Sequence, residues 1–381
     1  MVNFEFSAPG RILFGSGRSR EAATEIVGWG NRIFLVTGAD PTRAKPLREA
    51  LLERGAQLTE ISLSREPHVE DLLSGVAAAR CAKAHSVVAL GGGSVVDLGK
   101  AIAALAPYES DPLDHLEVVG KGLPLPGPGL PCAAVPTTAG TGAEATRNSV
   151  ISTGTVKVSL RGPQLMPRLA VVDPSYALGS PRDLTAWTGM DALTQLVEPL
   201  LSRFANPLTD ALCRQGILLS VRALPVALRD PNDLEARSDL ALASLFSGLA
   251  LANSKLGSVH GLAAPLGGMF PCPHGAVCAR LLVPAWKVNC AALGRAQSSV
   301  RERFLDASRL LSGRQDATLE DGLRVLERMA TAAAAPPLSR WGMTESDIPA
   351  VREAGLRASS MKGNPVDLSA EEVDLILREA L

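Results

Sequence analysis

The period of the hydrophobic pattern changes near residue 180. Before that point, short runs rich in Val, Ile, Leu and Ala alternate with amphipathic stretches. Such runs are typical of strands covered on both faces, as in a parallel sheet. We predict buried strands at Arg32–Thr37, 58–63, 86–90, Cys132–Pro136 and 169–173, and helices over 42–54, 69–84 and 95–106. This alternation predicts right-handed βαβ units.

After Pro181 the strand signals end and helical periodicity takes over. The helices that we expect cover Pro207–Arg229 and residues 193–202, 232–252, 299–313, 319–335 and 369–381. The predicted fold class is therefore α/β followed by all-α. We place a Rossmann-like dinucleotide-binding domain at 1–178 and a helical domain at 179–381.

Two loops that follow predicted strands have the composition of a phosphate-binding edge. A GGGS run at 91–94 precedes a helix that carries Asp97 and Lys100, and the loop 136–144 reads PTTAGTGAE. Glycine lets a backbone approach a ligand closely, and a helix N-terminus favours an anion. We expect both loops at one sheet edge, with Lys100 as a further phosphate partner. The alternative is a tight turn and a helix cap, since the G-x-G-x-x-G fingerprint is missing.

Four residues of the helical half form a candidate metal site. Asp191 and Gln195 are four positions apart, so a helix places them on one face. His260 and His274 are the two histidines after residue 180, and a glycine follows each. A lone histidine is more often a packing residue, but one carboxylate, one amide and two imidazoles together suit Fe(II) or Zn(II).

Composition and charge narrow the class of protein. Lys and Arg number 38 against 39 Asp and Glu, a formal net charge of −1 that gives no footprint for nucleic acid. We find neither a signal-peptide pattern nor a continuous apolar run of the ~18–20 residues that cross a bilayer. The six cysteines lack a CxxC pair and indicate reduced thiols, so we predict a soluble, cytoplasmic protein without a membrane partner. Cys272 and Cys278, which flank His274, are predicted to be packing residues.

A series of collinear motifs runs through essentially the whole chain. They are GRILFG at 10–15, GGGSVVDLGK at 91–100, PTTAGTGAE at 136–144, LAVVDP at 169–174, GMDALTQLVE at 189–198, HGLAAPLG at 260–267, PHG at 273–275 and NP at 364–365. In this order they resemble the iron-containing (group III) alcohol dehydrogenase family. The resemblance implies the dehydroquinate synthase-like fold, which glycerol dehydrogenase shares. That fold joins a dinucleotide-binding domain to a helical one.

The resemblance also implies roles for individual residues. The glycine run would hold the pyrophosphate, the threonine loop and Asp97 would line the nicotinamide side, and Lys157 would lie near the ribose. The cofactor residues implied in this way are Gly38, Gly91, Gly92, Gly93, Ser94, Asp97, Thr137, Thr138, Thr141 and Lys157. In the metal motif, Asp191, His260 and His274 match three ligands.

Two positions depart from the family pattern. Gln195 stands where the fourth ligand is normally histidine, and Ala264 stands where the family has a further histidine. An amide oxygen is a weaker donor than imidazole, so a divalent ion is expected to be held more loosely. The site would bind Fe(II) or Zn(II), fill weakly, or hold no metal, as in the maleylacetate reductase branch. We favour a site that binds metal; without one, His260 or His274 would act as the catalytic proton donor.

The predicted function is reversible hydride transfer between NAD or NADP and a small alcohol or aldehyde, by a homo-oligomer such as a dimer. Gly38 stands where many family members have a ribose-binding acid, which removes a barrier to a 2′-phosphate. Asp40 could replace that acid and Arg43 could favour the phosphate, so we predict a slight preference for NADP. The rival functions are a lyase or synthase of the dehydroquinate synthase type and a nucleotide-binding protein without catalysis.

Overall fold

The structure is a computed structural model that describes residues 3–117, 120–153 and 157–381. The chain forms two compact units. An α/β unit contains Ala8–Thr138 and Gly142–Leu178, and a helical unit contains residues 3–7, Ala139–Thr141 and Gly179–Leu381. The main division thus falls between residues 178 and 179, while a short stretch of the threonine loop belongs to the helical unit.

The α/β unit is built on a six-stranded parallel sheet with the order β1-β8-β5-β4-β2-β3. Its strands are β1 (Arg11–Phe14), β2 (Arg32–Thr37), β3 (Gln57–Ser62), β4 (Ser86–Gly91), β5 (Cys132–Pro136) and β8 (Leu169–Val172). Its helices are α1 (Arg18–Gly28), α2 (Lys45–Leu52), α3 (Val69–Cys81) and α4 (Gly93–Leu105). A separate antiparallel pair consists of β6 (Asn148–Ser152) and β7 (Lys157–Arg161). The predicted α/β class is confirmed.

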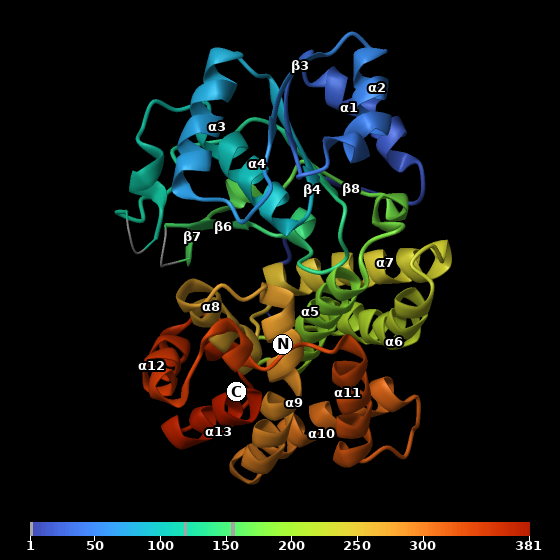
Figure 1. The fold of residues 1–381 in the computed structure, drawn as a ribbon, viewed down its shortest axis with the longest axis vertical. Coiled ribbons are helices and arrows are strands. Elements are labelled where there is room, and N and C mark those ends of the chain that lie inside the picture. The colour runs from blue at the N-terminus through green and yellow to red at the C-terminus, as the bar shows by residue number, and fades with distance from the viewer. Residues whose placement is uncertain (1–2, 118–119, 154–156) are drawn as a thin grey trace. The chain divides into compact units, whose positions relative to one another are not determined.

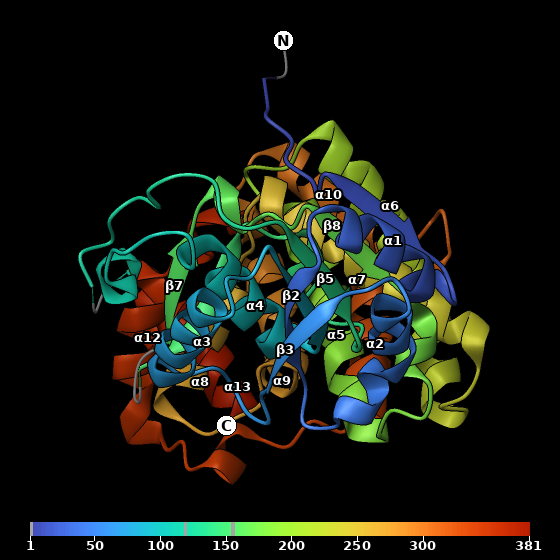
Figure 2. The same ribbon diagram turned by 90° about the horizontal axis from the view of Figure 1, so that it is seen from above.

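Both faces of the parallel sheet are covered by helices, as Figures 1 and 2 show. In β2, Ile33 and Leu35 pack with α1 and α2, whereas Phe34 and Val36 pack with α3 and α4. Alternate residues of a strand point to opposite faces, so a strand buried on both faces must be apolar at every position. The near-continuous apolar runs in the sequence therefore located these strands correctly.

Several short elements were not predicted. The strand β1 has four residues between glycines, and β6 and β7 carry polar side chains at partly exposed positions. Helix α1 buries Ser19, Ala22, Ala23 and Ile26, so its inner face consists mainly of small side chains. A face of that kind gives little hydrophobic periodicity.

The strand order reverses between β2 and β4. The chain passes from β2 outward to β3 and then returns to the other side of β2 to form β4. In open α/β sheets, ligands bind beyond the carboxyl ends of the strands at such a switch point. In the register, Thr37 of β2 lies opposite Leu90 of β4, so the chain leaves the sheet at Gly38 after β2 and directly after Gly91 of β4.

Close packing between α4 and β4 depends on Gly99. A methyl group at this position would lie 2.4 Å from the β-carbon of Ala89, whereas one on Gly28, at the end of α1, would meet nothing within 4 Å. Gly99→Ala should therefore lower the free energy of unfolding by about 1–3 kcal/mol through overpacking. Gly28→Ala is the matched control and should leave it nearly unchanged. Denaturant titration of both variants checks the prediction, and equal effects would contradict it.

The helical unit contains α5 (Arg182–Leu201), α6 (Pro207–Arg229), α7 (Leu234–Asn253), α8 (Ser258–Met269), α9 (His274–Ala292), α10 (Ser298–Ser312), α11 (Leu319–Ala333), α12 (Ile348–Arg357) and α13 (Ala370–Ala380). One large apolar core joins these helices. Among the described residues of the helical unit there is no strand. Helix α5 begins well before the expected residue 193, because it is buried on nearly all sides and lacks an amphipathic stripe. The glycine- and proline-containing sequences of α8 and α9 also concealed those helices.

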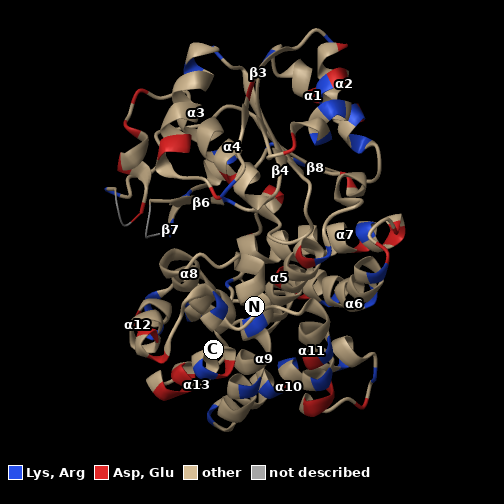
Figure 3. Cartoon of the chain, viewed as in Figure 1, with Lys and Arg blue, Asp and Glu red and all other residues tan. Residues whose placement is uncertain are grey.

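Two helices are long and apolar enough to cross a membrane by length and composition alone, α6 and the stretch His274–Arg295. The count rises to three if α7 and α8, which meet at a 95° bend, are taken as one span. Neither α6 nor the stretch His274–Arg295 is a continuous apolar run, since charged residues interrupt both helices. Their composition has another cause, since α9 is largely buried within the helical unit and α6 forms ion pairs through Asp210, Arg214 and Arg222. In Figure 3, charges of both signs are spread over the outer helices.

Candidate functional site

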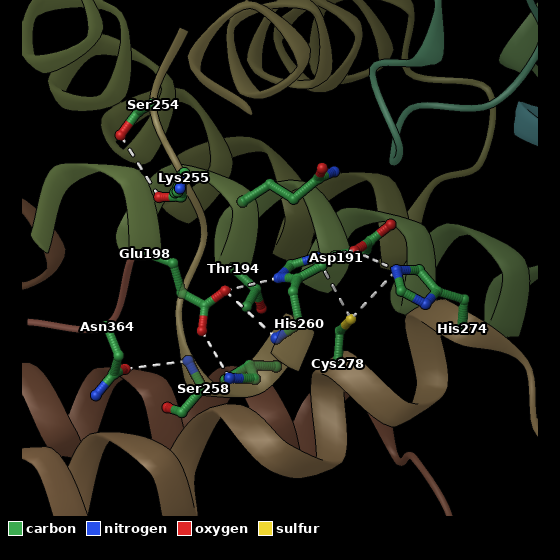
Figure 4. A network of polar contacts seen from close by, with 12 residues as sticks. Asp191, Thr194, Glu198, Ser254, Lys255, Ser258, His260, His274, Cys278 and Asn364 are labelled. Atoms are coloured by element: carbon green, nitrogen blue, oxygen red, sulfur yellow. Dashed lines mark hydrogen bonds and ion pairs between the residues drawn. The ribbon is translucent and has the colours of Figure 1, made fainter. Parts of the chain in front are cut away.

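Three helices of the helical unit bring polar side chains to one buried point. Asp191 and Glu198 are seven positions apart on α5, so they lie on the same face of the helix. His260 comes from the first turn of α8, and His274 and Cys278 lie one turn apart at the start of α9. Figure 4 shows the two imidazole rings, the Asp191 carboxylate and the Cys278 sulfur close together.

The carboxylate of Asp191 lies between the two histidines. Its Oδ1 is 3.2 Å from Nε2 of His260 and 3.6 Å from Nε2 of His274. Asp191 is 2% exposed and His260 6%, whereas the side chain of His274 is 37% exposed. The site is therefore dry on the side of α5 and α8 and accessible beside His274.

Glu198 holds the ring of His260 in place. Its Oε2 accepts a hydrogen bond of 2.7 Å from Nδ1 of His260, and its Oε1 accepts one of 2.7 Å from the backbone N–H of Val259. A carboxylate on one ring nitrogen fixes the tautomer and turns the other nitrogen toward a metal. Glu198 is not among the site residues predicted from the sequence, although its spacing from Asp191 on a helix could have indicated it.

The groups at this point need a cation among them. With Nδ1 of His260 donating to Glu198, Nε2 of the neutral ring is an acceptor that faces the acceptor oxygen of Asp191. Burial by itself lowers the pKa of His260, but Cys278 and the hydrogen bonds to Asp191 and Glu198 together raise it well above its ordinary value. Burial raises the pKa of Asp191, but His274 and His260 outweigh it and the net pKa is lowered. A proton on His260 or a bound metal ion satisfies the arrangement.

The donor set fits the metal ion that the resemblance implies. Asp191, His260, His274 and Cys278 each offer one ligand atom, and these four atoms lie within 4.8 Å of one another. One carboxylate oxygen and two imidazole nitrogens are common ligands of Zn(II) and Fe(II). The structure thus brings Asp191, His260 and His274, three of the predicted ligands, together with Cys278.

Gln195, the fourth predicted ligand, is buried and bonded to the threonine loop. Its Nε2 donates a hydrogen bond of 3.0 Å to the carbonyl of Gly140. The amide nitrogen is therefore engaged, and Oε1 is the atom left to Gln195 for any contact with a metal. The hydroxyl of Ser247 lies 3.4 Å from the same carbonyl.

The interpretation of Cys278 as a plain packing residue does not describe its position. The side chain is buried, as expected, but its sulfur lies 3.7 Å from Nε2 of each histidine. Cys272, in contrast, donates to the carbonyl of Leu266 at 3.5 Å and lies outside this cluster. The four-residue spacing of His274 and Cys278 was the available signal, and it was missed because α9 was not predicted.

In the α/β unit, the two predicted loops leave adjacent strands at the same sheet edge. Gly91 of β4 lies opposite Pro136 of β5, and the N–H of Thr137 donates to the carbonyl of Gly91 at 2.9 Å. A β-carbon on Gly92 would lie 3.6 Å from the hydroxyl oxygen of Thr138. Gly93 and Ser94 begin α4, so the N–H groups of its first turn open at this edge.

Lys100 has a structural role, and its expected role as a phosphate partner is wrong. Its ammonium group is fully buried and donates to the carbonyls of Ala143 and Asn148 and to the hydroxyl of Thr146. It also pairs with Asp97 at 3.1 Å. A lysine two turns along α4 points into the packed interior, and these four partners leave it no donor for a ligand.

The other residues assigned to the cofactor are spread around this edge. Asp97 accepts from the N–H of Val150, and burial raises its pKa despite the neighbouring Lys100. Lys157, on β7, forms an ion pair of 2.8 Å with Glu66. Thr141 belongs to the short stretch packed in the helical unit. Their roles toward a cofactor stay predictions.

Glu144, at the end of the threonine loop, should make stability depend on pH. Burial raises its pKa to about 7 from an ordinary 4.5, against the opposing effect of its own backbone hydrogen bond and of Lys100. The folded state therefore favours the protonated acid. Stability is complete below the unfolded pKa and falls as the pH rises through the folded pKa. Glu144→Gln cannot ionise at this position. Its free energy of unfolding should therefore rise by about 2–4 kcal/mol relative to that of the unsubstituted protein when the pH is raised from 4.5 to 8. Unfolding titrations at both pH values test this, and a difference that does not vary with pH would contradict it.

Comparison with known proteins supports the resemblance. Residues 9–174 match the family model described as iron-containing alcohol dehydrogenase, and residues 185–381 match the model of the C-terminal region of the same family. The chain belongs to the iron-containing alcohol dehydrogenase family. The relationship predicted from the motifs is thus confirmed.

The similarity to relatives of known structure or activity extends over essentially the whole chain. The 1,3-propanediol dehydrogenase of Klebsiella pneumoniae is 35% identical over an alignment of 403 positions, gaps included. The alignment covers 99% of this chain and 98% of that protein. A crystal structure of 1,3-propanediol oxidoreductase superposes with a TM-score of 0.91 at 31% identity, with full coverage of both chains. A sulfoacetaldehyde reductase from Bifidobacterium kashiwanohense, solved in complex with NAD⁺, has a TM-score of 0.87 at 25% identity and covers 100% of this chain and 99% of that one. The protein is an oxidoreductase of the iron-containing alcohol dehydrogenase type.

Proposed function

We propose that the protein catalyses reversible hydride transfer between a nicotinamide dinucleotide and a small alcohol or aldehyde, with a divalent metal ion held by Asp191, His260 and His274. The observation that carries the proposal is the convergence of one carboxylate oxygen and two imidazole nitrogens in a largely buried site. The oxygen of Asp191 lies 3.2 Å from the nitrogen of His260 and 3.6 Å from that of His274. A nicotinamide supplies the hydride chemistry, and the protein supplies position and charge.

Each residue of the site has a distinct task in this reaction. A bound metal ion would act as a Lewis acid on the substrate oxygen. Asp191 contributes the negative charge that holds a cation, and the accessible side of His274 admits the substrate. Glu198 fixes the orientation of His260 through its hydrogen bond to Nδ1. Pre-set groups of this kind lower the cost of reorganisation when charge develops.

The dinucleotide would bind at the carboxyl edge of the parallel sheet. Support comes from the strand switch point between β2 and β4, the glycine turn at 91–93 and the hydroxyl of Thr138 beside it. The loop that carries Thr138 continues to Gly140, whose carbonyl accepts the hydrogen bond of Gln195.

We propose NAD rather than NADP as the cofactor. Asp40, close after β2, is exposed. Hydrogen bonds from the hydroxyl and the N–H of Thr42 lower its pKa and keep it ionised. Arg43 donates to the carbonyl of Tyr176 at 2.6 Å. An ionised carboxylate opposes a 2′-phosphate, and an engaged arginine attracts it less. These contacts weaken the argument from Gly38 for NADP. Comparison of kcat/KM for the two reduced cofactors decides between them.

We also propose that the protein is cytoplasmic. All six cysteines are free in the described chain, which supports a reducing, cytoplasmic compartment. The expected homo-oligomer, a dimer, stays a prediction that sedimentation of the purified protein can test.

The proposed activity is tested with purified protein, a panel of short-chain aldehydes and reduced cofactor. We expect aldehyde-dependent oxidation of NADH that is lost after removal of divalent metal with a chelator and restored by Zn(II) or Fe(II). Full activity in a metal-free sample would contradict the metal's role. Lack of cofactor oxidation with every aldehyde, and of cofactor reduction with the corresponding alcohols, would contradict the reaction.

A further inference from the structure

We propose that Cys278 is a thiolate ligand of the metal site and completes a mixed oxygen, nitrogen and sulfur centre suited to zinc. The inference rests on the metal site of the proposed function and names one more ligand and the preferred ion. From the sequence alone, Cys278 is predicted to be a packing residue.

Four of the distances among the donor atoms are close to those of a tetrahedral site. Metal–ligand distances of about 2.0–2.3 Å place the donors of a tetrahedron about 3.3–3.6 Å apart. The sulfur of Cys278 is 3.7 Å from each imidazole Nε2. The oxygen of Asp191 is 3.2 and 3.6 Å from the same two nitrogens. Four of the six edges of a tetrahedron are therefore close to the lengths that a zinc ion requires.

The surroundings of the sulfur favour this role over simple packing. Cys278 is fully buried, and its hydrogen-bonding contacts are the two imidazoles and the Asp191 carboxylate. Cys272 shows the ordinary alternative, since its thiol points to a backbone carbonyl. A thiol among metal-binding side chains, one helical turn after His274, is placed as a ligand.

Charge balance also favours the thiolate over the amide of Gln195. A divalent ion with Asp191, Cys278 and two neutral histidines has a ligand set that neutralises it, whereas the same ion with a neutral amide keeps a net positive charge. An uncompensated buried charge is costly. The amide nitrogen of Gln195 is moreover held by the carbonyl of Gly140.

The sulfur ligand changes the metal that the site prefers. Thiolate is a soft donor and a tetrahedral set with sulfur and nitrogen is typical of zinc, while Fe(II) is favoured by nitrogen and carboxylate ligands. Binding of the ion releases the thiol proton to solvent and forms a metal–sulfur bond, with no change in oxidation state. The protein should therefore select zinc when both ions are offered.

X-ray absorption at the zinc edge of the zinc-loaded, full-length protein tests the inference directly. We expect one sulfur neighbour at about 2.3 Å together with nitrogen and oxygen neighbours at about 2.0–2.1 Å. Cys278→Ser should remove the sulfur signal, and Cys272→Ser, the matched control, should keep it. Zinc affinity measured by competition with a chromogenic chelator should fall at least about tenfold in Cys278→Ser and remain unchanged in Cys272→Ser.

The spectrum of the unsubstituted protein decides the matter even if a variant fails to fold. Zinc bound by nitrogen and oxygen alone would overturn the thiolate ligand and leave the proposed reaction standing. A sulfur signal that persists in Cys278→Ser would overturn it as well. Failure of the protein to bind zinc would overturn it together with the metal part of the proposed function. Aldehyde-dependent NADH oxidation, measured on the same sample, would then show whether hydride transfer survives.

Discussion

Asp191→Asn should lose metal affinity by more than about 100-fold and lower kcat/KM by about 10²–10³. The substitution keeps the shape of the side chain but removes the charge that faces both imidazoles at 3.2 and 3.6 Å. Asp191 is the one carboxylate in the donor cluster among the described residues, so no other carboxylate can take its place. Metal content of the dialysed protein and steady-state rates with NADH measure the two effects.

The control for this variant is Asp183→Asn. Asp183 lies in the first turn of the same helix but is exposed, and it should tolerate the change. Wild-type metal affinity and activity in Asp191→Asn would contradict the site as described. Equal losses in the two variants would point to a general effect on α5 instead.

Glu198→Gln should weaken metal binding by about 10–100-fold although Glu198 is not in the donor cluster. Its carboxylate accepts from Nδ1 of His260 and from the N–H of Val259, and it is 7% exposed. A neutral amide accepts more weakly and no longer favours the tautomer that turns Nε2 toward Asp191. Loss of the charge-assisted hydrogen bond should also lower the free energy of unfolding by about 1.5–3 kcal/mol.

Metal affinity separates a positioning role from a merely structural one. If Glu198 orients His260, the affinity of the folded protein must fall, beyond any loss of stability. Glu235→Gln, at an exposed position in the first turn of α7, is the control and should change neither quantity. A Glu198→Gln protein that is less stable but binds metal normally would show that the carboxylate only supports the fold.

The sequence predicted the elements whose burial pattern repeats regularly. The strands β2, β4, β5 and β8 are apolar at nearly every position because helices cover both faces, and Pro207–Arg229 forms the helix that the sequence predicts. Helix α11 also begins at residue 319, as the sequence predicts, and Thr318 and Asp321 form a reciprocal capping box at this end. Regular burial and local hydrogen bonding are both properties of short stretches of sequence.

Only part of the site can be predicted from the sequence, because some of its residues matter only through contacts between helices that are distant in the chain. Asp191, His260 and His274 were chosen by residue type and motif, and the structure brings them together. Cys278 and Glu198 were missed because their importance arises from helices α5, α8 and α9 meeting at one point. Lys100 was misjudged for the complementary reason, since the acceptors that bury its charge come from a segment more than 40 positions later.

Transfer of a labelled hydride from the cofactor to the aldehyde is the defining step of the proposed reaction and can be followed directly. The protein is incubated with an aldehyde and NADH that carries deuterium at the transferable position of the nicotinamide, and the alcohol product is analysed by mass spectrometry. We expect one deuterium on the carbinol carbon, formed together with NAD⁺. Alcohol without deuterium, or no alcohol at all across the aldehydes tested, would contradict it.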